Sequence, residues 1–317
     1  MLNSGVFSVL ENEWLNERHD GALFSLEGKL AFSTDSYVVN PVFFPGGNIG
    51  DLAVNGTVND LAMCGAMARY LSLSFILEEG LPMTEFWEIL QSIRAACDQA
   101  GVKVVTGDTK VVEKGKGDKI FINTSGIGQV HRRADIRLSR IREGDVIILN
   151  NPLAAHGIAI MSRRQGLEFE SDITSDTTCL HYTVQKLLDA FGEQVHFLRD
   201  ATRGGLAGVL NEMARDAQQG IHIRQKDIQV DGQVAGACEM LGLDPLYVAN
   251  EGVFVLVADP AIANDVLQLL QSDEQGRQAA AIGQVTAEHR GQVILRSTIG
   301  GSRVVNMLPG EQLPRIC

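Results

Sequence analysis

The apolar positions of the chain follow a strand-like period of two in some stretches and a helix-like period of 3.6 in others. Residues 71–75 alternate apolar and polar side chains, which is typical of a half-buried strand. From Thr84 to Gly101 the apolar residues have helical spacing, with a capping threonine at the start and a glycine at the end. Residues 102–105 are the next predicted strand. This succession of strands and helices predicts an α/β fold.

One predicted helix, over residues 49–64, is apolar on nearly every side and should therefore be buried. Asp60 falls on its small, apolar side, so neither Asp60 nor its neighbour Asn59 is expected to face bulk water. A buried carboxylate is costly unless it is paired, hydrogen-bonded or bound to a metal. We favour a ligand role for Asp60, and an aspartate held by backbone amides is the alternative.

Two further carboxylates follow predicted strands. Asp35 comes directly after the strand over residues 30–34, where a metal or phosphate ligand and a cap of the next turn are equally good interpretations. Asp108 follows the strand over residues 102–105, beside Gly107, and it has the chemistry to hold a cation, while Lys110 has the charge to neutralise an anion. A hairpin that turns at residues 114–118 is predicted to follow.

Two stretches of the second half contain candidate functional residues. Residues 202–205 read Thr-Arg-Gly-Gly and open an amphipathic helix, so their backbone amides and the helix dipole form a candidate anion site. The spacing is neither that of a P-loop nor that of a dinucleotide-binding fingerprint. Glu251 stands beside Gly252 before a strand, and the sequence leaves open whether it is a loop residue or a positioned base.

A short internal repeat indicates two similar halves. The tetrapeptide Ile-Gly-Gln-Val occurs at residues 127–130 and again at residues 282–285, each time near the end of a run of strands and helices. We place the boundary near residues 136–144. The expected division is a first domain over residues 1–140, a second over residues 141–300, and a tail over residues 301–317.

The composition limits the possible location, cysteine chemistry and partners of the protein. The chain of 317 residues has no apolar run long enough for a membrane span and no signal peptide at its start, so we expect a cytoplasmic protein. Its five cysteines form no CxxC pair, which favours reduced thiols over disulfides or a zinc site. The net charge of -12 argues against nucleic acid as a partner and implies that an anionic substrate needs a local cation.

The end of the sequence is chemically unusual. Cys317 is its last residue, so the thiol stands beside a terminal carboxylate, and residues 307–314 contain two prolines and a glycine. This segment is expected to be extended and mobile, like a tether for a reactive group. A frayed end that happens to finish in cysteine is the alternative, and a prenylation signal is excluded because it needs three residues after the cysteine.

Several of these motifs together resemble a superfamily of ATP-using enzymes that includes aminoimidazole ribonucleotide (AIR) synthetase, thiamine-phosphate kinase and selenophosphate synthetase. The shared motifs are Ser33-Thr34-Asp35, Asn59-Asp60-Leu61-Ala62, Gly107-Asp108-Thr109 and the run from Asp200 to Gly205. Within the superfamily the chain resembles the HypE-type hydrogenase maturation factors, which make the cyanide ligands of [NiFe] hydrogenases. That closer resemblance rests on residues 34–38, 44–50 and 107–112 and on the terminal Pro314-Arg315-Ile316-Cys317.

The resemblance implies a fold, a reaction and partners. The fold is α/β, with two AIR-synthetase-like domains, of which the N-terminal one forms a homodimer through a shared β-barrel. The reaction is the ATP-dependent dehydration of a carbamoyl group on Cys317 to a thiocyanate, with Mg²⁺ as cofactor. The implied partners are the carbamoyltransferase HypF, as carbamoyl donor, and the HypC–HypD complex, as cyanide acceptor; no nucleic acid or membrane is implied.

The same resemblance assigns site residues. Beside Cys317, Glu251 would remove protons from nitrogen and Lys110 would stabilise charge on the oxygen that is phosphorylated. The expected metal ligands are Asp35, Asp60, Asp108 and Asp200. The expected nucleotide site comprises these four aspartates with Asn59, Thr202, Arg203, Gly204 and Gly205.

The sequence departs from the pattern in two places. No glycine-rich phosphate-binding segment precedes residues 2–5, which implies either a truncated chain or weakened nucleotide binding. Ala154 and Ala155 stand where relatives often have Gly-Asp, so any role of that aspartate is lost or moved. A superfamily enzyme that releases a small-molecule product and a non-catalytic scaffold therefore stay open as rival functions.

Overall fold

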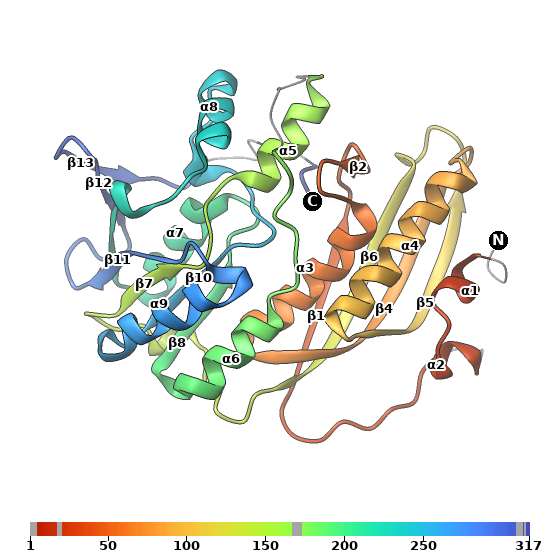
Figure 1. The fold of residues 1–317 in the computed structure, drawn as a ribbon, viewed down its shortest axis with the longest axis horizontal. Helices are drawn as coiled ribbons and strands as arrows, with labels where there is room; N and C mark the ends of the chain where they lie inside the picture. Colours follow the sequence, from red (N-terminus) through yellow and green to blue (C-terminus); the bar gives the residue numbers. More distant parts are fainter. Residues whose placement is uncertain (1–4, 18–20, 167–172, 309–312, 314) are drawn as a thin grey trace.

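The computed structural model describes residues 5–17, 21–166, 173–308, 313 and 315–317. Two β-sheets with helices packed on them account for most of these residues, one sheet in each half of the chain (Figure 1). The mixed α/β fold is thereby confirmed. Among the described residues, no helix is long and apolar enough to cross a membrane.

The first half forms a four-stranded sheet in the order β1-β6-β4-β5. Its strands are β1 (Leu30–Tyr37), β4 (Ala66–Glu78), β5 (Lys103–Val112) and β6 (Ile120–Val130), with a two-stranded ribbon of β2 (Phe43–Phe44) and β3 (Gly47–Asn48) beside them. Its helices are α1 (Phe7–Val9), α2 (Glu13–Asn16), α3 (Ile49–Met63) and α4 (Met83–Ala100).

Helix α3 lies at the centre of the molecule. Nearly all of its residues are buried, as its all-round apolar pattern predicts, because it packs on β1, β6 and β4 and also on α4, α6 and β8. Asn48 caps its start, where Asn48 and Asp51 form a capping box. The last turn, with Ala62 and Met63, belongs to the hydrophobic core of the second half, so α3 joins the two halves.

Two local predictions for this sheet are wrong. Asp35 and Asp108 do not follow strands but lie within β1 and β5, which are longer than their apolar runs. The predicted hairpin at residues 114–118 does not form, because β5 and β6 lie on opposite sides of β4. Strand β5 instead pairs parallel with β4 after the crossover helix α4, a connection that local patterns do not reveal.

The second half contains a seven-stranded sheet in the order β13-β12-β9-β11-β7-β10-β8. Its strands are β7 (Val146–Leu149), β8 (Val195–Asp200), β9 (Gly220–Arg224), β10 (Phe254–Ala258), β11 (Ala280–Thr286), β12 (Val293–Arg296) and β13 (Ser302–Val305). Its α-helices are α5 (Ala155–Arg164), α6 (His181–Phe191), α7 (Gly205–Ala217), α8 (Gly232–Leu241) and α9 (Ala263–Ser272). Short 3₁₀ helices are η2 (Leu138–Arg140), η3 (Gly192–Gln194), η4 (Gln225–Asp227), η5 (Pro245–Tyr247), η6 (Pro260–Ile262) and η7 (Glu274–Gly276).

Two apolar layers cover this sheet. One core cluster joins α5, α7 and α8 to the inward side chains of β7, β9 and β11, and a second joins α6 and α9 to β7, β8 and β10. Both copies of the repeated tetrapeptide lie in strands, β6 in the first half and β11 in the second. The domain limits given above stay predictions.

Candidate active site at the C-terminal cysteine

The tail that carries Cys317 is docked against the body of the protein. The backbone N–H of Val38 donates to the carbonyl oxygen of Cys317 at 3.1 Å, and that of Asn40 donates to the carbonyl of Arg315 at 3.2 Å. Ile316 is only 3% exposed and belongs to the core of the first half. The C-terminus therefore lies beside β2, between the two halves (Figure 1). The extended tail was predicted, but its docked end was not; the middle of the tail, residues 309–312, lies outside the described residues.

Three side chains hold the tail: two from α5 and that of Arg315 in the tail itself. His156 of α5 contacts the Ile316 carbonyl through Nε2 at 2.9 Å; because a carbonyl only accepts, Nε2 carries the proton. Arg164, the last residue of the same helix, donates to the Arg315 carbonyl at 2.8 Å. Arg315 itself donates to the Val38 carbonyl at 3.1 Å and forms an ion pair with Asp118. A series of hydrogen bonds thus positions the last three residues, up to and including Cys317.

A group of carboxylates lies near the segment after β1 to which the tail is hydrogen-bonded. Asp35 of β1, Asp60 near the end of α3 and Asp200 at the end of β8 interact electrostatically. Burial, and then the charge of Asp60, raises the pKa of Asp200 to about 7. Burial also raises the pKa of Asp60, although its carboxylate accepts a hydrogen bond from the Ser33 hydroxyl at 2.6 Å.

The only cation that lowers both of these pKa values is Arg199, as far as the described residues show, and Arg199 is itself paired with Glu212 at 2.8 Å. The three carboxylates therefore repel one another with little compensation from the protein. Oxygen ligands in such an arrangement suit Mg²⁺, whose charge would relieve the repulsion. The residues present thus fit a magnesium ion.

Glu251 is 4% exposed and is held by its backbone. The carboxylate of Asp176 accepts from the N–H groups of Glu251 and Gly252 at 3.1 and 3.0 Å, and the carbonyl of Glu251 accepts from the Asn59 side chain at 3.0 Å. Burial, followed by the charges of Asp176 and Asp200, raises the pKa of Glu251 well above its ordinary value. A carboxylate of this kind is a strong base once it is deprotonated.

Tyr37 links the carboxylates to the tail. It is fully buried, and burial together with the charges of Asp35 and Glu251 raises the pKa of its hydroxyl. Gly56 of α3 allows this packing, since a Cβ at that position would lie 2.2 Å from the Tyr37 hydroxyl oxygen. Tyr37 directly precedes Val38, whose backbone is hydrogen-bonded to Cys317. The residue next to the one that binds Cys317 is therefore a tyrosine whose pKa is raised by the charge of Glu251.

Asp108 and Lys110 lie apart from this group. Asp108 is the register partner of Ser74, which pairs with Asn123, which in turn pairs with Ser36. Residues in one row point to the same face of a sheet, and consecutive residues point to opposite faces. Asp108 and Lys110 therefore face outward, whereas Asp35, next to Ser36, faces α3. Strands β5 and β1 are also three spacings apart, about 14 Å.

On that outer face Asp108 and Lys110 pair with each other. Their shortest contact is 2.7 Å, and the hydrogen bond from Lys110 lowers the pKa of Asp108. Both side chains are more than half exposed, so this ion pair contributes little to stability. Within one chain, neither residue reaches Cys317 or the other carboxylates.

The remaining predicted nucleotide-binding residues lie in two different environments. Thr202, Arg203, Gly204 and Gly205 lead from Asp200 into α7, with Gly204 in a left-handed conformation at φ 75°. Their place between a carboxylate and a helix start is compatible with a phosphate site. The Asn59 side chain instead makes three hydrogen bonds to backbone groups, of Thr178, Leu180 and Glu251, and these bonds position the Glu251 segment.

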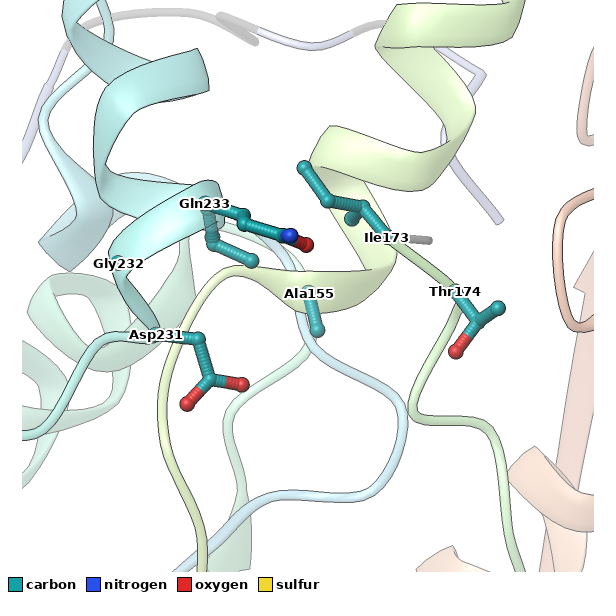
Figure 2. Close-up of a pocket in the computed structure, with 7 residues that line it drawn as sticks. Ala155, Ile173, Thr174, Asp231, Gly232 and Gln233 are labelled. Atoms are coloured by element: carbon teal, nitrogen blue, oxygen red, sulfur yellow. The ribbon is translucent and has the colours of Figure 1, made fainter. Parts of the chain in front are cut away.

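Figure 2 shows a cavity of about 340 Å³ at the start of α5 and α8. Its lining includes Ala155, which stands where relatives often have an aspartate, together with Thr174 and Asp231. Ala154, just before it, has φ 78°, the left-handed conformation that favours glycine. Ala154 therefore has the backbone conformation expected of the glycine in the Gly-Asp motif, although the sequence has alanine at both positions.

Sequence reasoning missed Tyr37, His156, Arg164 and Asp176. Each acts through a contact with a residue far along the chain, such as His156 with Ile316 or Asp176 with Glu251. His156 was noted only as part of a departure from a motif. Tyr37 lies in a motif on which the resemblance rests, but no local pattern reveals the contacts of any of the four.

Comparisons with known proteins place these observations in a family. The model of the N-terminal domain of AIR synthase related proteins matches residues 18–130, and that of the C-terminal domain matches residues 142–296. The Carbamoyl dehydratase HypE of Rhizobium leguminosarum bv. viciae is 47% identical over 318 residues, which cover 100% of this chain and 91% of that protein.

Solved structures agree with this. A crystal structure of the hydrogenase maturation protein HypE in complex with ATP matches with a TM-score of 0.96 and 45% identity, over 100% of this chain and 95% of that one. A chain from the crystal structure of a HypE–HypF complex matches with a TM-score of 0.86 and 41% identity, over 95% of this chain and 97% of that one.

Proposed function

The chain belongs to the HypE family of carbamoyl dehydratases, and from that premise we propose that Cys317 carries the group that is dehydrated. The reaction converts a carbamoyl group on its thiol to a thiocyanate at the expense of ATP, and it supplies cyanide ligands for the [NiFe] hydrogenase centre. The observation that carries the assignment is the docked tail, whose Cys317 is hydrogen-bonded to Val38, directly after the strand of Asp35 and Tyr37.

ATP is needed because the oxygen of an amide is a poor leaving group. The amide oxygen attacks the γ-phosphorus of ATP, ADP leaves, and one proton is lost from nitrogen, which gives an S-bound isourea-like phosphate. The C–O bond then breaks, phosphate departs, and the second nitrogen-bound proton is lost. The product is S–C≡N on the cysteine, with ADP, phosphate and protons released.

Glu251 is the residue we assign to proton removal from nitrogen. Its burial and its acidic neighbours raise its pKa, which makes its carboxylate a stronger base than one in water. Asn59 and Asp176 fix its backbone, so the carboxylate does not depend on a mobile loop. The dry surroundings also keep water away from the activated intermediate.

Asp35, Asp60 and Asp200 are the residues we assign to magnesium within one chain. Magnesium, when bound, would screen the triphosphate and align its γ-phosphoryl group. The mutual repulsion of these carboxylates and the raised pKa of Asp200 support a cation here. The Thr202–Gly205 segment, at the start of α7, would hold phosphate through its backbone amides.

We also propose a homodimer in which Lys110 acts on the cysteine of the other copy. Lys110 faces outward from the edge strand farthest from β1, so it reaches a carbamoyl oxygen on Cys317 only if a second chain presents it. Phe32, on the same outer face, is 68% exposed, which fits a surface that another sheet covers. Asp108, the ion-pair partner of Lys110, would then reach the metal site in the same way.

The partners follow from the chemistry and from the structural match. The HypE–HypF complex supports HypF as the carbamoyl donor, and the HypC–HypD complex is our proposed acceptor of cyanide. Both exchanges require Cys317 to leave its docked position. The contacts of the tail with His156 and Arg164 are hydrogen bonds, and among the described residues of its docked end, 313 and 315–317, Ile316 is the one fully buried side chain, which suits reversible docking.

The test is intact-mass spectrometry after incubation with a carbamoyl donor, the carbamoyltransferase and ATP. We expect an adduct of one carbamoyl group that subsequently loses the mass of one water, and Cys317→Ala should show neither species. A free small-molecule product with no protein adduct would refute the assignment. Absence of Mg-ATP binding in calorimetry would instead favour a non-catalytic scaffold.

A further inference from the structure

A compact group of metal-ligand atoms lies on the seven-stranded sheet, where three strands separate β9 from β8, the strand that carries Asp200. His222 lies on β9, and Glu288 and His289 lie in the loop between β11 and β12. Each offers one ligand atom, and the three atoms all lie within 4.8 Å of one another. We propose that this group binds a divalent transition-metal ion, a second metal site that is independent of the carbamoyl chemistry.

The donor atoms already have nearly the required spacing. His222 Nε2 and His289 Nδ1 are 3.1 Å apart. Two imidazole nitrogens bound tetrahedrally to zinc, at about 2.0–2.1 Å from the metal, are about 3.3 Å apart. An ion would therefore enter with small side-chain rotations, replacing the hydrogen bond between the two rings.

The backbone holds the loop against the strand. Gly220 allows the contact, since a Cβ there would lie 1.7 Å from the carbonyl oxygen of Glu288. One residue on, the N–H of Ile221 donates to the Gln292 carbonyl at 3.0 Å. His289 adopts φ 52°, a conformation that non-glycine residues rarely take and that is often kept where a side chain has a function.

The direction of the side chains leaves the site accessible. Ile221 and Ile223 point into the core beneath α7, so His222 between them points to the opposite face of the sheet. His222 is partly exposed, and Glu288 and His289 are exposed. Three protein ligands leave at least one coordination position for water or for another donor.

The donor set defines the class of ion. Imidazole nitrogens suit zinc, nickel, cobalt and copper, whereas Mg²⁺ takes oxygen ligands almost exclusively. The aspartates beside Cys317 offer oxygen alone, so the two sites should not compete for the same ion. Excess Mg²⁺ therefore separates them in an experiment.

The experiment titrates the full chain, without an affinity tag, with Zn²⁺ and Co²⁺ in excess Mg²⁺, against a chromophoric chelator. The test variants are His222→Gln, His289→Gln and Glu288→Gln. The matched control is His131→Gln, which removes a histidine whose described partners are the carboxylate of Asp189 and the backbone N–H of Arg133.

We expect wild type and the control to bind one equivalent, with visible cobalt bands that lack sulfur-to-metal charge transfer. His222→Gln and His289→Gln should weaken binding by at least about 10-fold, the lower bound seen when even a supporting partner of a ligand is lost. Unchanged affinity in those variants, or sulfur-type cobalt bands, would place the ion on thiols and overturn the proposal. Should His222→Gln disturb the strand, the two variants of the exposed loop decide.

Discussion

The sharpest test of the site concerns Lys110, because the structure separates it from Cys317 within one chain. Strands β1 and β5 are about 14 Å apart, and Lys110 faces away from α3. That gap exceeds the reach of a lysine side chain from its Cα, roughly 6 Å in extended form. If Lys110 takes part in the reaction, it should therefore act on the cysteine of a second copy.

The perturbation combines two inactive variants in one dimer. Lys110→Ala and Cys317→Ala chains are co-expressed with different tags, and heterodimers are isolated by two successive affinity steps. One of the two sites then contains Cys317 from one chain and Lys110 from the other, and the second site lacks both. Each heterodimer should show about half of the wild-type activity, whereas either homodimer should show none.

The assay is ATP-dependent loss of water from the carbamoylated chain, followed by intact mass. The matched control pairs Glu251→Gln with Cys317→Ala, because Glu251 and the docked tail belong to the same chain. That heterodimer should stay nearly inactive. Inactive Lys110→Ala/Cys317→Ala heterodimers would show that Lys110 does not act between chains, and a monomer in light scattering would remove the dimer itself.

Three further outcomes are expected. Glu251→Gln should keep ATP binding but slow dehydration by about 10²- to 10⁴-fold, and normal turnover would exclude Glu251 as the base. Asp200→Asn should stabilise the protein at pH 8: the folded pKa of about 7 lies above the unfolded value of about 3.9, so wild-type stability falls as pH rises between them, by roughly 4 kcal/mol. Thermal denaturation from pH 4 to 8 checks this, and parallel curves for both proteins would contradict it. His156→Ala should speed alkylation of Cys317 by a small maleimide about 2- to 10-fold, because it removes one hydrogen bond that holds the tail; equal rates in the variant and in wild type would refute docking through His156. In wild type, a non-hydrolysable ATP analogue should slow the same alkylation.

The sequence predicts well those features that depend on local periodicity. The all-round apolar pattern of residues 49–64 correctly indicates a buried helix, and Gly101 ends α4 in the left-handed conformation expected of a helix-terminating glycine. The pattern of its helix favoured Asp60 as a ligand, the position of Asp35 left a ligand role open, and the resemblance added Asp200. The fold brings the three together although they lie on α3, β1 and β8. The choice of residues was therefore available from the sequence, but their mutual pKa shifts were not.

Features that depend on pairing between distant strands could not be predicted. Nothing local in residues 103–130 reveals that β4 separates β5 from β6, so Asp108 was taken for a turn residue. The docked tail is a similar case. Its prolines and glycine predict an extended chain, but these three residues lie outside the described residues, and the binding partners of the docked end, Val38, His156 and Arg164, lie elsewhere in the sequence.

The carboxylates next to the tail show why such a site resists local prediction. Burial of Asp200, together with the charges of Asp60 and Asp35, raises its pKa to about 7, so the fold carries an electrostatic cost that no single segment encodes. A chain under selection for stability alone would replace one of these acids with an amide of the same shape. In the function we propose, a cation and a phosphate bind beside these carboxylates, and the electrostatic cost is then the driving force for binding the cation. The stability gained by Asp200→Asn and the magnesium affinity it loses should therefore be two measures of one interaction.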